Sequence, residues 1–575
     1  MKKIFNPTEW KGFSQACLRH PWHVPVIAFE LTLLIYRRFR NQLVLLTTKD
    51  KHYGIKQFPS WLPKIQSASL KAIQDLNFPS LAITLNSTDF GINKRSFDEG
   101  DKEAHFQKNR WASCIEMILR SSIDEEVISS IRAWIASPPP KGDQAWETYS
   151  CCERIANLSL LLCSYPQIQD QFDKDLLISF YVENGNWIGS HLEYYGLEQT
   201  NNHFFNNGRA LIIAGIVSNH QAWIDAGLSI FRKFAPLLFG SDGFLREGSS
   251  HYQLVVAGWF FDGLEFAKTK VNLAESDPLV LLASKVGTAC QQLSIALPDT
   301  VTHIGDISPD IHPKLSLARL KALYSPWFAG NQTDSELVSR SSKEWFFTHT
   351  ATDTVVARWP NQWPVKWTTH AHADLGSFVW RNRERWILVD PGRIDYTIKG
   401  NQQLWAKSHN TILINGVPPL AESILIAGIW YPKFYTQAQI ESVAGKEGEL
   451  ALTHNGFSRT IPNLIHTRKL NLTDDGLKVV DNLQGSGVVQ VELMWNFPPE
   501  FVPLKNNLIG DDQVQINLIC KDSRQVVHHT KAEQYPFSGS YSEGVPAYRM
   551  IVNCELDLPC SIETQFIIKN LLCAE

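Results

Sequence analysis

The chain has 575 residues, more than one hydrophobic core usually supports, so two or three domains are expected. Hydrophobic residues make up 44% and charged residues 19%, which excludes a largely disordered chain. The formal net charge of −4 argues against a nucleic-acid partner, because such a partner usually requires a basic face. Aromatic residues reach 11%, which suits stacking against sugar rings but also the packing of large cores.

Residues 1–95 form an irregular N-terminal region in which no chemistry is indicated. Met1-Lys2-Lys3 looks like the start of a signal peptide, but polar residues follow where an apolar run should stand. The apolar stretch 24–36 contains Glu30 and is too short to span a bilayer, which favours a buried or amphipathic helix over peripheral membrane contact. We therefore expect no integral membrane segment and a cytoplasmic location, with the periplasm as the alternative. The ten cysteines follow no metal or disulfide spacing, which favours unpaired buried thiols.

Residues 96–340 are predicted to form a helical domain. Apolar residues recur at three-to-four spacing in 115–135 and 155–162, and Pro138-Pro139-Pro140 separates these two segments. Further helices are expected at the ranges 174–190, 204–218, 221–238, 251–268 and 279–296. Helices of this length with short connections imply stacked antiparallel pairs, so an α/α toroid and an ordinary helical bundle both remain possible.

Residues 341–575 are predicted to form an antiparallel β-sandwich. The period changes to two near residue 345, and many strands follow without intervening helices. Expected strands include 354–359, 377–380, 386–389, 411–414, 465–472, 477–483, 488–496, 513–519 and 562–568. A cleft between a helical domain and a β domain is a natural place for a long ligand.

Two polar clusters open apolar helices in the helical domain. The first, 201–209, combines asparagines with His203 and Arg209, and capping alone explains the asparagines but not the other two. The second, 246–252, contains Glu247 and serines that could be simple caps, and Tyr252 could be a packing residue. Either cluster alone is a weak signal.

Two further clusters lie in the predicted sandwich. On a strand, His370, His372 and Asp374 would share one face, which favours a site over isolated surface residues. Asp390 ends an apolar strand and His409 precedes another. His372, Asp390 and His409 therefore offer nitrogen, oxygen and nitrogen ligands of a kind that zinc accepts.

Taken in chain order, these clusters resemble the heparinase II/III-like polysaccharide lyases, which include alginate and oligoalginate lyases. The signatures are Asn-Asn-His, Glu-Gly-Ser-x-His-Tyr, His-x-His-x-Asp, Asp-Pro-Gly and His-Asn. Each is weak alone, whereas five in the family's order are specific, and they cover most of the chain outside 1–95. The resemblance implies an incomplete N-terminal α/α toroid followed by an antiparallel β-sandwich, in agreement with the periodicity.

The resemblance also implies a mechanism, namely β-elimination from a uronic-acid-containing glycan. Asn202 corresponds to the residue that neutralises the uronate carboxylate, with His203 beside it, and Tyr252 to the principal acid/base residue. His370 is the expected partner from the sandwich side. A phenol titrates near 10, so a basic Tyr252 would need nearby positive charge or hydrogen-bond donors.

The same resemblance assigns the remaining polar residues of the motifs. Substrate-binding roles are expected for Arg209, Arg246 and Glu247, and the two arginines could supply the positive charge near Tyr252. The metal ligands would be His372, Asp390 and His409, holding a structural zinc that orders the segment carrying His370.

Two other functions remain open at this point. A glycoside hydrolase needs two carboxylates flanking the bond, which Glu247 with Asp306 or Asp310 could supply. A non-catalytic glycan-binding protein of bacterial polysaccharide synthesis is the second alternative. The expected partner is an anionic polysaccharide or oligosaccharide of heparan, alginate or bacterial exopolysaccharide type, and the motifs indicate no oligomeric state.

Overall fold

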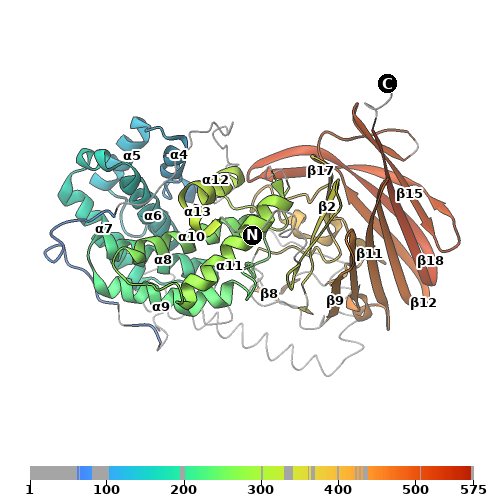
Figure 1. Ribbon diagram of the computed structural model, residues 1–575, viewed down its shortest axis with the longest axis horizontal. Coiled ribbons are helices and arrows are strands. Elements are labelled where there is room, and N and C mark those ends of the chain that lie inside the picture. The colour runs from blue at the N-terminus through green and yellow to red at the C-terminus, as the bar shows by residue number, and fades with distance from the viewer. Residues whose placement is uncertain are drawn as a thin grey trace.

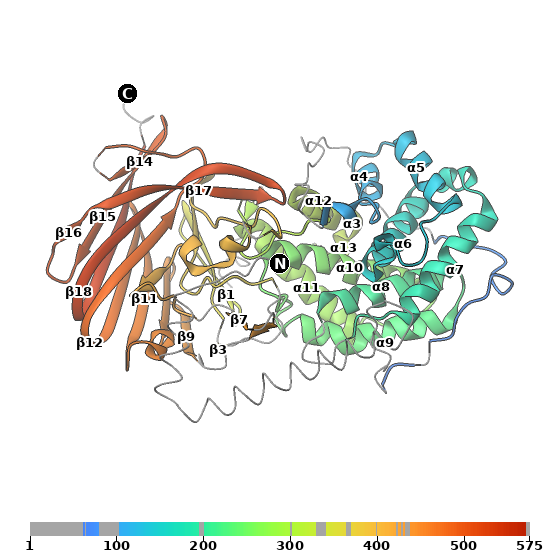
Figure 2. The same ribbon diagram turned by 180° about the vertical axis from the view of Figure 1, so that it is seen from behind.

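A computed structural model describes most of the chain beyond the N-terminal region. The described residues are 61–63, 65–79, 103–194, 201–298, 302–328, 341–360, 362–363, 370–397, 400–420, 424–426, 429–431, 438–505 and 507–570. A helical part is followed along the chain by a sheet part, and the two lie side by side (Figures 1 and 2). The predicted helix within 24–36 lies outside the described residues.

The helices follow the predicted periodicity, except that the predicted segment 115–135 is two helices separated at residues 121–124. They are α3 (Glu103–Gln107), α4 (Ser113–Arg120), α5 (Glu125–Ala136), α6 (Thr148–Ser164), α7 (Lys174–Ser190), α8 (Asn202–Val217), α9 (Gln221–Leu238), α10 (Ser250–Lys268), α11 (Pro278–Ala296), α12 (Pro313–Leu323) and α13 (Ser325–Phe328). Several begin at a side chain that accepts a first-turn backbone N–H, as Asp124, Asp173 and Ser249 do. Such caps satisfy donors that the helix itself leaves unpaired.

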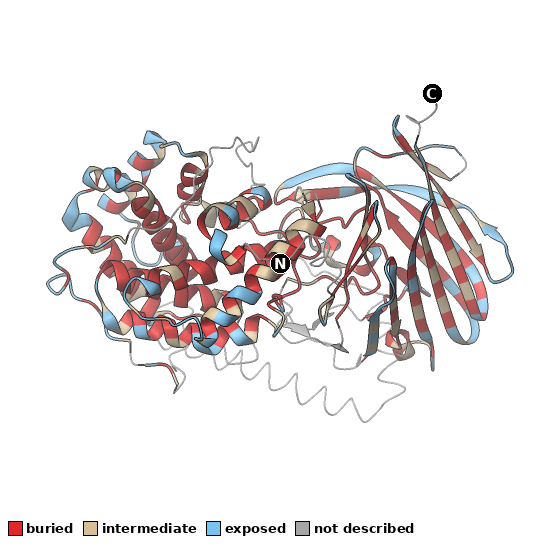
Figure 3. Ribbon diagram, in the orientation of Figure 1, coloured by how far each residue is buried: buried red, intermediate tan, exposed pale blue. Residues whose placement is uncertain are grey.

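Burial distinguishes inner helices from outer ones. Helices α6, α8 and α10 are buried nearly all round, whereas α5, α7, α9 and α11 expose one face (Figure 3). Helix α8 packs against α6, α9 and α10. This alternation of inner and outer helices confirms the predicted incomplete α/α toroid. Leu62, Ala68 and Ile73, from the predicted N-terminal region, pack into the same helical core.

The C-terminal part confirms the antiparallel sandwich. Its small sheet has the order β1 (Trp345–His349), β2 (Asp353–Arg358), β4 (Val379–Asn382) and β5 (Arg385–Leu388). Its large sheet contains β3 (Gln362–Trp363), β6 (Ile412–Ile414), β9 (Ala438–Ala444), β10 (Glu449–His454), β11 (Ile465–Thr473), β12 (Gly476–Asn496), β13 (Val502–Pro503), β14 (Leu508–Gly510), β15 (Val514–Asp522), β16 (Val527–His528), β17 (Thr530–Ser540) and β18 (Glu543–Asn570). A separate pair joins β7 (Ile424–Ile426) to β8 (Ile429–Tyr431). One apolar core lies between the two main sheets.

Two strand predictions need correction. The segments 477–483 and 488–496 are one continuous strand, β12, because an irregularity between Leu483 and Gly487 lets its pairing with β18 continue. The segment 370–374 is a loop and not a strand. Its side chains are instead held by residues of the helical part, as described below.

An apolar interface fastens the helical part to the sandwich. Leu293 and Ala296 of α11 cluster with Trp345 and Phe347 of β1. Helix α11 is also the one described helix whose length and apolar character would allow a membrane crossing, but half of its apolar stretch is buried in the protein, so this is weak evidence for a span. The described cysteines are all buried and unpaired, as predicted.

Candidate active site and metal centre

The N-terminal end of α8 positions the first two candidate residues. Asn201 caps the helix by accepting a hydrogen bond from the His203 backbone N–H at 3.1 Å. The Asn202 N–H donates instead to Oε1 of Glu247 at 3.0 Å. Asn202 is buried, whereas the His203 side chain is 37% exposed. The first turn of α8 is therefore tied to the segment that precedes α10.

Two glycines allow the chain to bring the second motif close to the sandwich. Gly248 has a φ of +76°, and a Cβ there would lie 2.6 Å from Cζ of Arg358 and 2.7 Å from the Ala371 Cβ. Gly305 has a φ of +83°, and a Cβ there would lie 2.8 Å from the backbone oxygen of His370. Both the backbone conformation and the space require glycine.

Tyr252, in the first turn of α10, meets His370 from the sandwich. Their rings stack with centroids 3.6 Å apart and an interplanar angle of 9°. Nδ2 of Asn202 donates to Nε2 of His370 at 3.1 Å. The three predicted residues Asn202, Tyr252 and His370 are thus brought together across the interface between the two parts of the chain.

Tyr396 joins this group, although no sequence motif pointed to it. Its hydroxyl lies 2.9 Å from the Tyr252 hydroxyl, so the two phenols share a hydrogen bond. The guanidinium of Arg393 lies over the Tyr396 ring, 4.1 Å from its centroid. The proximity of both residues to the Asp390-Pro391-Gly392 motif is the only signal that sequence reasoning could have used.

Asp306 connects the histidines of the loop 370–374. Nδ1 of His370 donates to one carboxylate oxygen at 3.0 Å, and Nε2 of His372 donates to the other at 2.9 Å. Arg393 contacts both oxygens at 2.8 Å. Burial alone would raise the pKa of Asp306, but Arg393 and the two histidine hydrogen bonds hold it well below its usual range. The carboxylate is therefore ionised at any physiological pH.

The protonation of His203 is controlled by Glu193. Nδ1 of His203 lies 2.9 Å from Oε1 of Glu193. Burial would lower the pKa of His203, but the charge and hydrogen bond of Glu193 outweigh it and raise the pKa to about 9. His203 is consequently a cation at neutral pH.

The surroundings of Tyr252 favour its neutral form, whereas those of His203 favour its charged form. Burial, followed by the neighbouring Tyr396 and Asp310, raises the pKa of Tyr252 well above its usual value. The expectation that Arg209 and Arg246 would lower this pKa is not met. Resting Tyr252 is therefore a neutral phenol, able to donate a proton.

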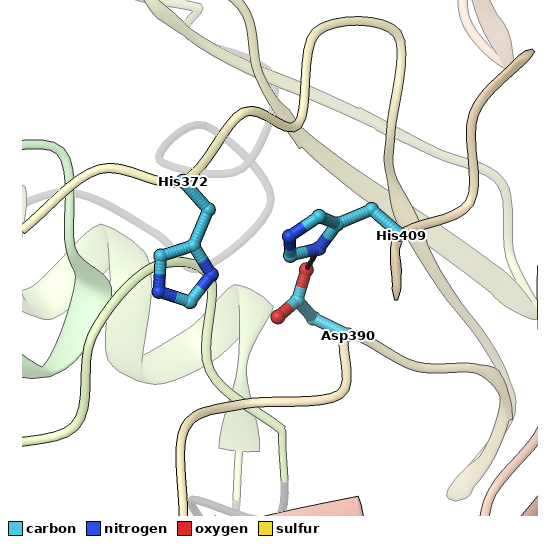
Figure 4. A group of neighbouring side chains, drawn as sticks. All are labelled: His372, Asp390 and His409. Atoms are coloured by element: carbon cyan, nitrogen blue, oxygen red, sulfur yellow. Dashed lines mark hydrogen bonds and ion pairs between the residues drawn. The ribbon is translucent and has the colours of Figure 1, made fainter. Parts of the chain in front are cut away.

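His372, Asp390 and His409 lie together as a buried group (Figure 4). One ligand atom from each lies within 4.8 Å of the others. Nδ1 of His409 donates to Asp390 at 2.8 Å, while Nε2 of His409 and Nδ1 of His372 are buried without a hydrogen-bond partner. Buried imidazole nitrogens rarely stay unpaired, so this donor set fits a metal ion such as zinc.

The three predicted substrate-binding residues differ in how far they are buried and in what they contact. Arg209 is fully buried in the helical core, where it pairs with Glu153 at 2.8 Å and with Asp262 at 2.7 Å. This geometry ties Arg209 to the packing of the toroid and leaves it unable to reach a ligand. Arg246 is exposed. Glu247 is fully buried and holds the start of α8, as described above.

Two of the three carboxylates considered for a glycoside hydrolase, Asp306 and Asp310, are held by cationic and hydrogen-bonding partners. Asp306 accepts hydrogen bonds from Arg393 and from two histidines. Asp310 accepts hydrogen bonds from Arg110 and Tyr149. Burial opposes ionisation of Asp310, but Arg110 and Tyr149 lower its pKa. A hydrolase needs one protonated carboxylic acid, which neither residue supplies.

Comparison with known families identifies two matching regions. The family model described as "Heparinase II/III N-terminus" matches residues 48–316, and "Heparinase II/III-like, C-terminal" matches residues 354–547. Together they cover most of the chain, including every candidate site residue. No curated protein sequence matches the chain.

Solved structures share the two-part architecture. A heparinase III crystal structure is 14% identical, with a TM-score of 0.61 over 99% of this chain and 94% of that chain. Another heparinase III is 17% identical, with a TM-score of 0.56 over 84% and 81% of the two chains. A mutant of the heparan sulfate lyase HepC from Pedobacter heparinus is 16% identical, with a TM-score of 0.54 over 84% and 79%. At such identities the likeness establishes the fold.

Proposed function

We propose that this chain, which belongs to the heparinase II/III-like family and is a polysaccharide lyase, cleaves a uronic-acid-containing glycan by β-elimination. The observation that carries the proposal is the assembly of Asn202, Tyr252 and His370 at the interface of the two parts. These residues are a hydrogen-bond donor, a phenol and an imidazole. Together they supply what elimination next to a carboxylate requires.

The first requirement is to stabilise the charge that develops on the uronate carboxylate when C5 loses its proton. Asn202 offers an amide donor held by the start of α8. His203 offers a positive charge at neutral pH, maintained by Glu193. Donors fixed in place before the reaction stabilise the enolate-like state more than they stabilise the bound substrate.

The second requirement is a base for C5 and an acid for O4. Nε2 of His370 accepts the hydrogen bond from Asn202, so it carries a lone pair, which becomes available to the C5 proton when the Asn202 amide turns to the uronate carboxylate, whereas Tyr252 retains its phenolic proton. In the proposed step His370 takes the C5 proton, the C4–C5 double bond forms, the C4–O4 bond breaks, and Tyr252 protonates O4. Proton transfer from His370 back to Tyr252 then restores both groups. Tyr396 supports the transient phenolate through the shared hydrogen bond.

A zinc ion, held by His372, Asp390 and His409, would order the loop that carries His370. This role needs no contact between the metal and the glycan. The proposed steps at C5 and O4 depend only on side chains of the chain itself.

The test is formation of an unsaturated uronate, detected by absorbance at about 230 nm, on a panel of unsulfated and sulfated heparan-type glycans, alginate and bacterial exopolysaccharides. We expect absorbance to rise with at least one of these substrates. New reducing ends without absorbance would support a hydrolase instead. Binding without turnover across the panel would support a glycan-binding protein.

A further inference from the structure

Asp306 occupies a central position between the two predicted sites. It lies in the loop between α11 and α12, and its side chain is 1% exposed. That loop is fixed to its surroundings, because the Asp306 N–H donates to the His370 carbonyl and the Asp306 carbonyl accepts from the hydroxyl of Ser249, the N-terminal cap of α10. A residue of the helical part therefore reaches the loop that carries both histidines.

The two oxygens of this carboxylate serve two different histidines. One oxygen holds His370, which stacks on Tyr252, and the other holds His372, which belongs to the candidate metal group. Arg393 contacts both oxygens and offsets the cost of burying the charge. Rotation of this carboxylate would consequently move both imidazoles.

The carboxylate also determines which ring nitrogens are available. An ionised carboxylate can only accept hydrogen bonds, so the proton of a neutral His370 lies on Nδ1 and that of His372 lies on Nε2. This leaves Nε2 of His370 for the proton from C5. It equally leaves Nδ1 of His372, which is buried without a hydrogen-bond partner, for a metal ion.

We propose that Asp306 is a positioning residue that ties the orientation of the catalytic imidazole of His370 to the metal ligand His372. The inference rests on the proposed role of His370 in β-elimination. It goes further by making the two sites interdependent, since each imidazole is oriented by the same carboxylate. Removing the carboxylate partner of a metal-bound histidine typically lowers metal affinity or activity by about 10- to 100-fold.

The experiment compares Asp306→Asn with Asp310→Asn in the full chain. Asp310 lies in the same loop and is a buried, ion-paired carboxylate that contacts neither histidine, so it controls for general disturbance of the loop. Zinc affinity is measured without substrate by competition with a chelator. Turnover is measured on the glycan that the wild-type protein cleaves, and folding is checked by circular dichroism.

We expect Asp306→Asn to weaken zinc binding by about 10- to 100-fold and to lower kcat by a similar factor with little change in KM. Asp310→Asn should leave zinc affinity within about twofold of the wild type. Comparing the zinc-saturated protein with the zinc-free protein should show a change in kcat in the wild type and none in Asp306→Asn, because the connection between the two sites is broken in the variant.

Wild-type zinc affinity in Asp306→Asn, or equal losses of zinc affinity in the two variants, would overturn the inference. If Asp306→Asn does not fold, the same inference is tested by removing zinc from the wild type. Zinc removal should lower kcat about tenfold with KM and folding unchanged. An unchanged kcat would overturn the inference. A wild-type chain that binds no zinc would overturn it as well. Failure of the proposed function is seen separately, as no unsaturated product on any uronate glycan, and the zinc measurements are unaffected by that outcome.

Discussion

Replacing Tyr252 by phenylalanine removes one hydroxyl and keeps the ring that stacks on His370 at 3.6 Å. The structural loss is the hydrogen bond to Tyr396, and one such bond contributes about 0.5–1.5 kcal/mol to stability. The chemical loss is larger, because in the proposed mechanism the proton for O4 comes from this hydroxyl. Loss of a general acid typically slows a reaction about 10²- to 10⁴-fold, which corresponds to about 2.7–5.4 kcal/mol in the barrier.

Tyr396→Phe is the matched control for this variant. It removes the same hydrogen bond from the other side but leaves the Tyr252 hydroxyl in place. Both variants should therefore lose similar stability in thermal unfolding, whereas only Tyr252→Phe should lose turnover by two orders of magnitude or more, assayed at about 230 nm. Turnover of Tyr252→Phe within tenfold of the wild type would refute the acid role. Equal losses in the two variants would show that the hydrogen bond matters and that the proton does not come from Tyr252.

Four further predictions concern the rest of the site. The cationic form of His203 is lost as pH rises through its raised pKa of about 9, so kcat/KM should fall near that pH. Glu193→Gln should move this fall to lower pH. An unchanged pH profile of kcat/KM in Glu193→Gln would exclude His203 as the charged group. Asn202→Ala should lower kcat more than it raises KM, and a change in KM alone would make it an ordinary binding residue. His409→Ala should abolish zinc binding and cost about 3–5 kcal/mol in denaturant unfolding, because it leaves the buried Asp390 carboxylate without its partner. A His409→Ala variant that keeps its zinc and its stability would contradict the metal site. The helical and sandwich halves, separated near residue 340, should each be inactive alone, and activity of the isolated helical half would make His370 structural.

The site was only partly predictable from local patterns. Asn202, Tyr252 and His370 belong to motifs that were recognised, and the structure brings them into contact. Tyr396 and the linking role of Asp306 were missed, because their partners lie 144 and 64 residues away in the chain. No local spacing reports a hydrogen bond over such distances. The missed residues are those whose function depends on a partner in the other half of the molecule.

The sequence by itself determined the order of the architecture, helices before strands, because the hydrophobic period changes from 3.6 to two near residue 345. It also determined the starts of α8 and α10, where Asn201 and Ser249 cap their helices through local hydrogen bonds. Only the tertiary structure decided that Arg209 is an internal ion-pair residue. Helix periodicity fixes which residues share a face, whereas burial and ion pairing depend on which other helices cover that face. For the same reason the protonated state of Tyr252 and the ionised state of Asp306 follow from burial and from neighbours distant in the chain.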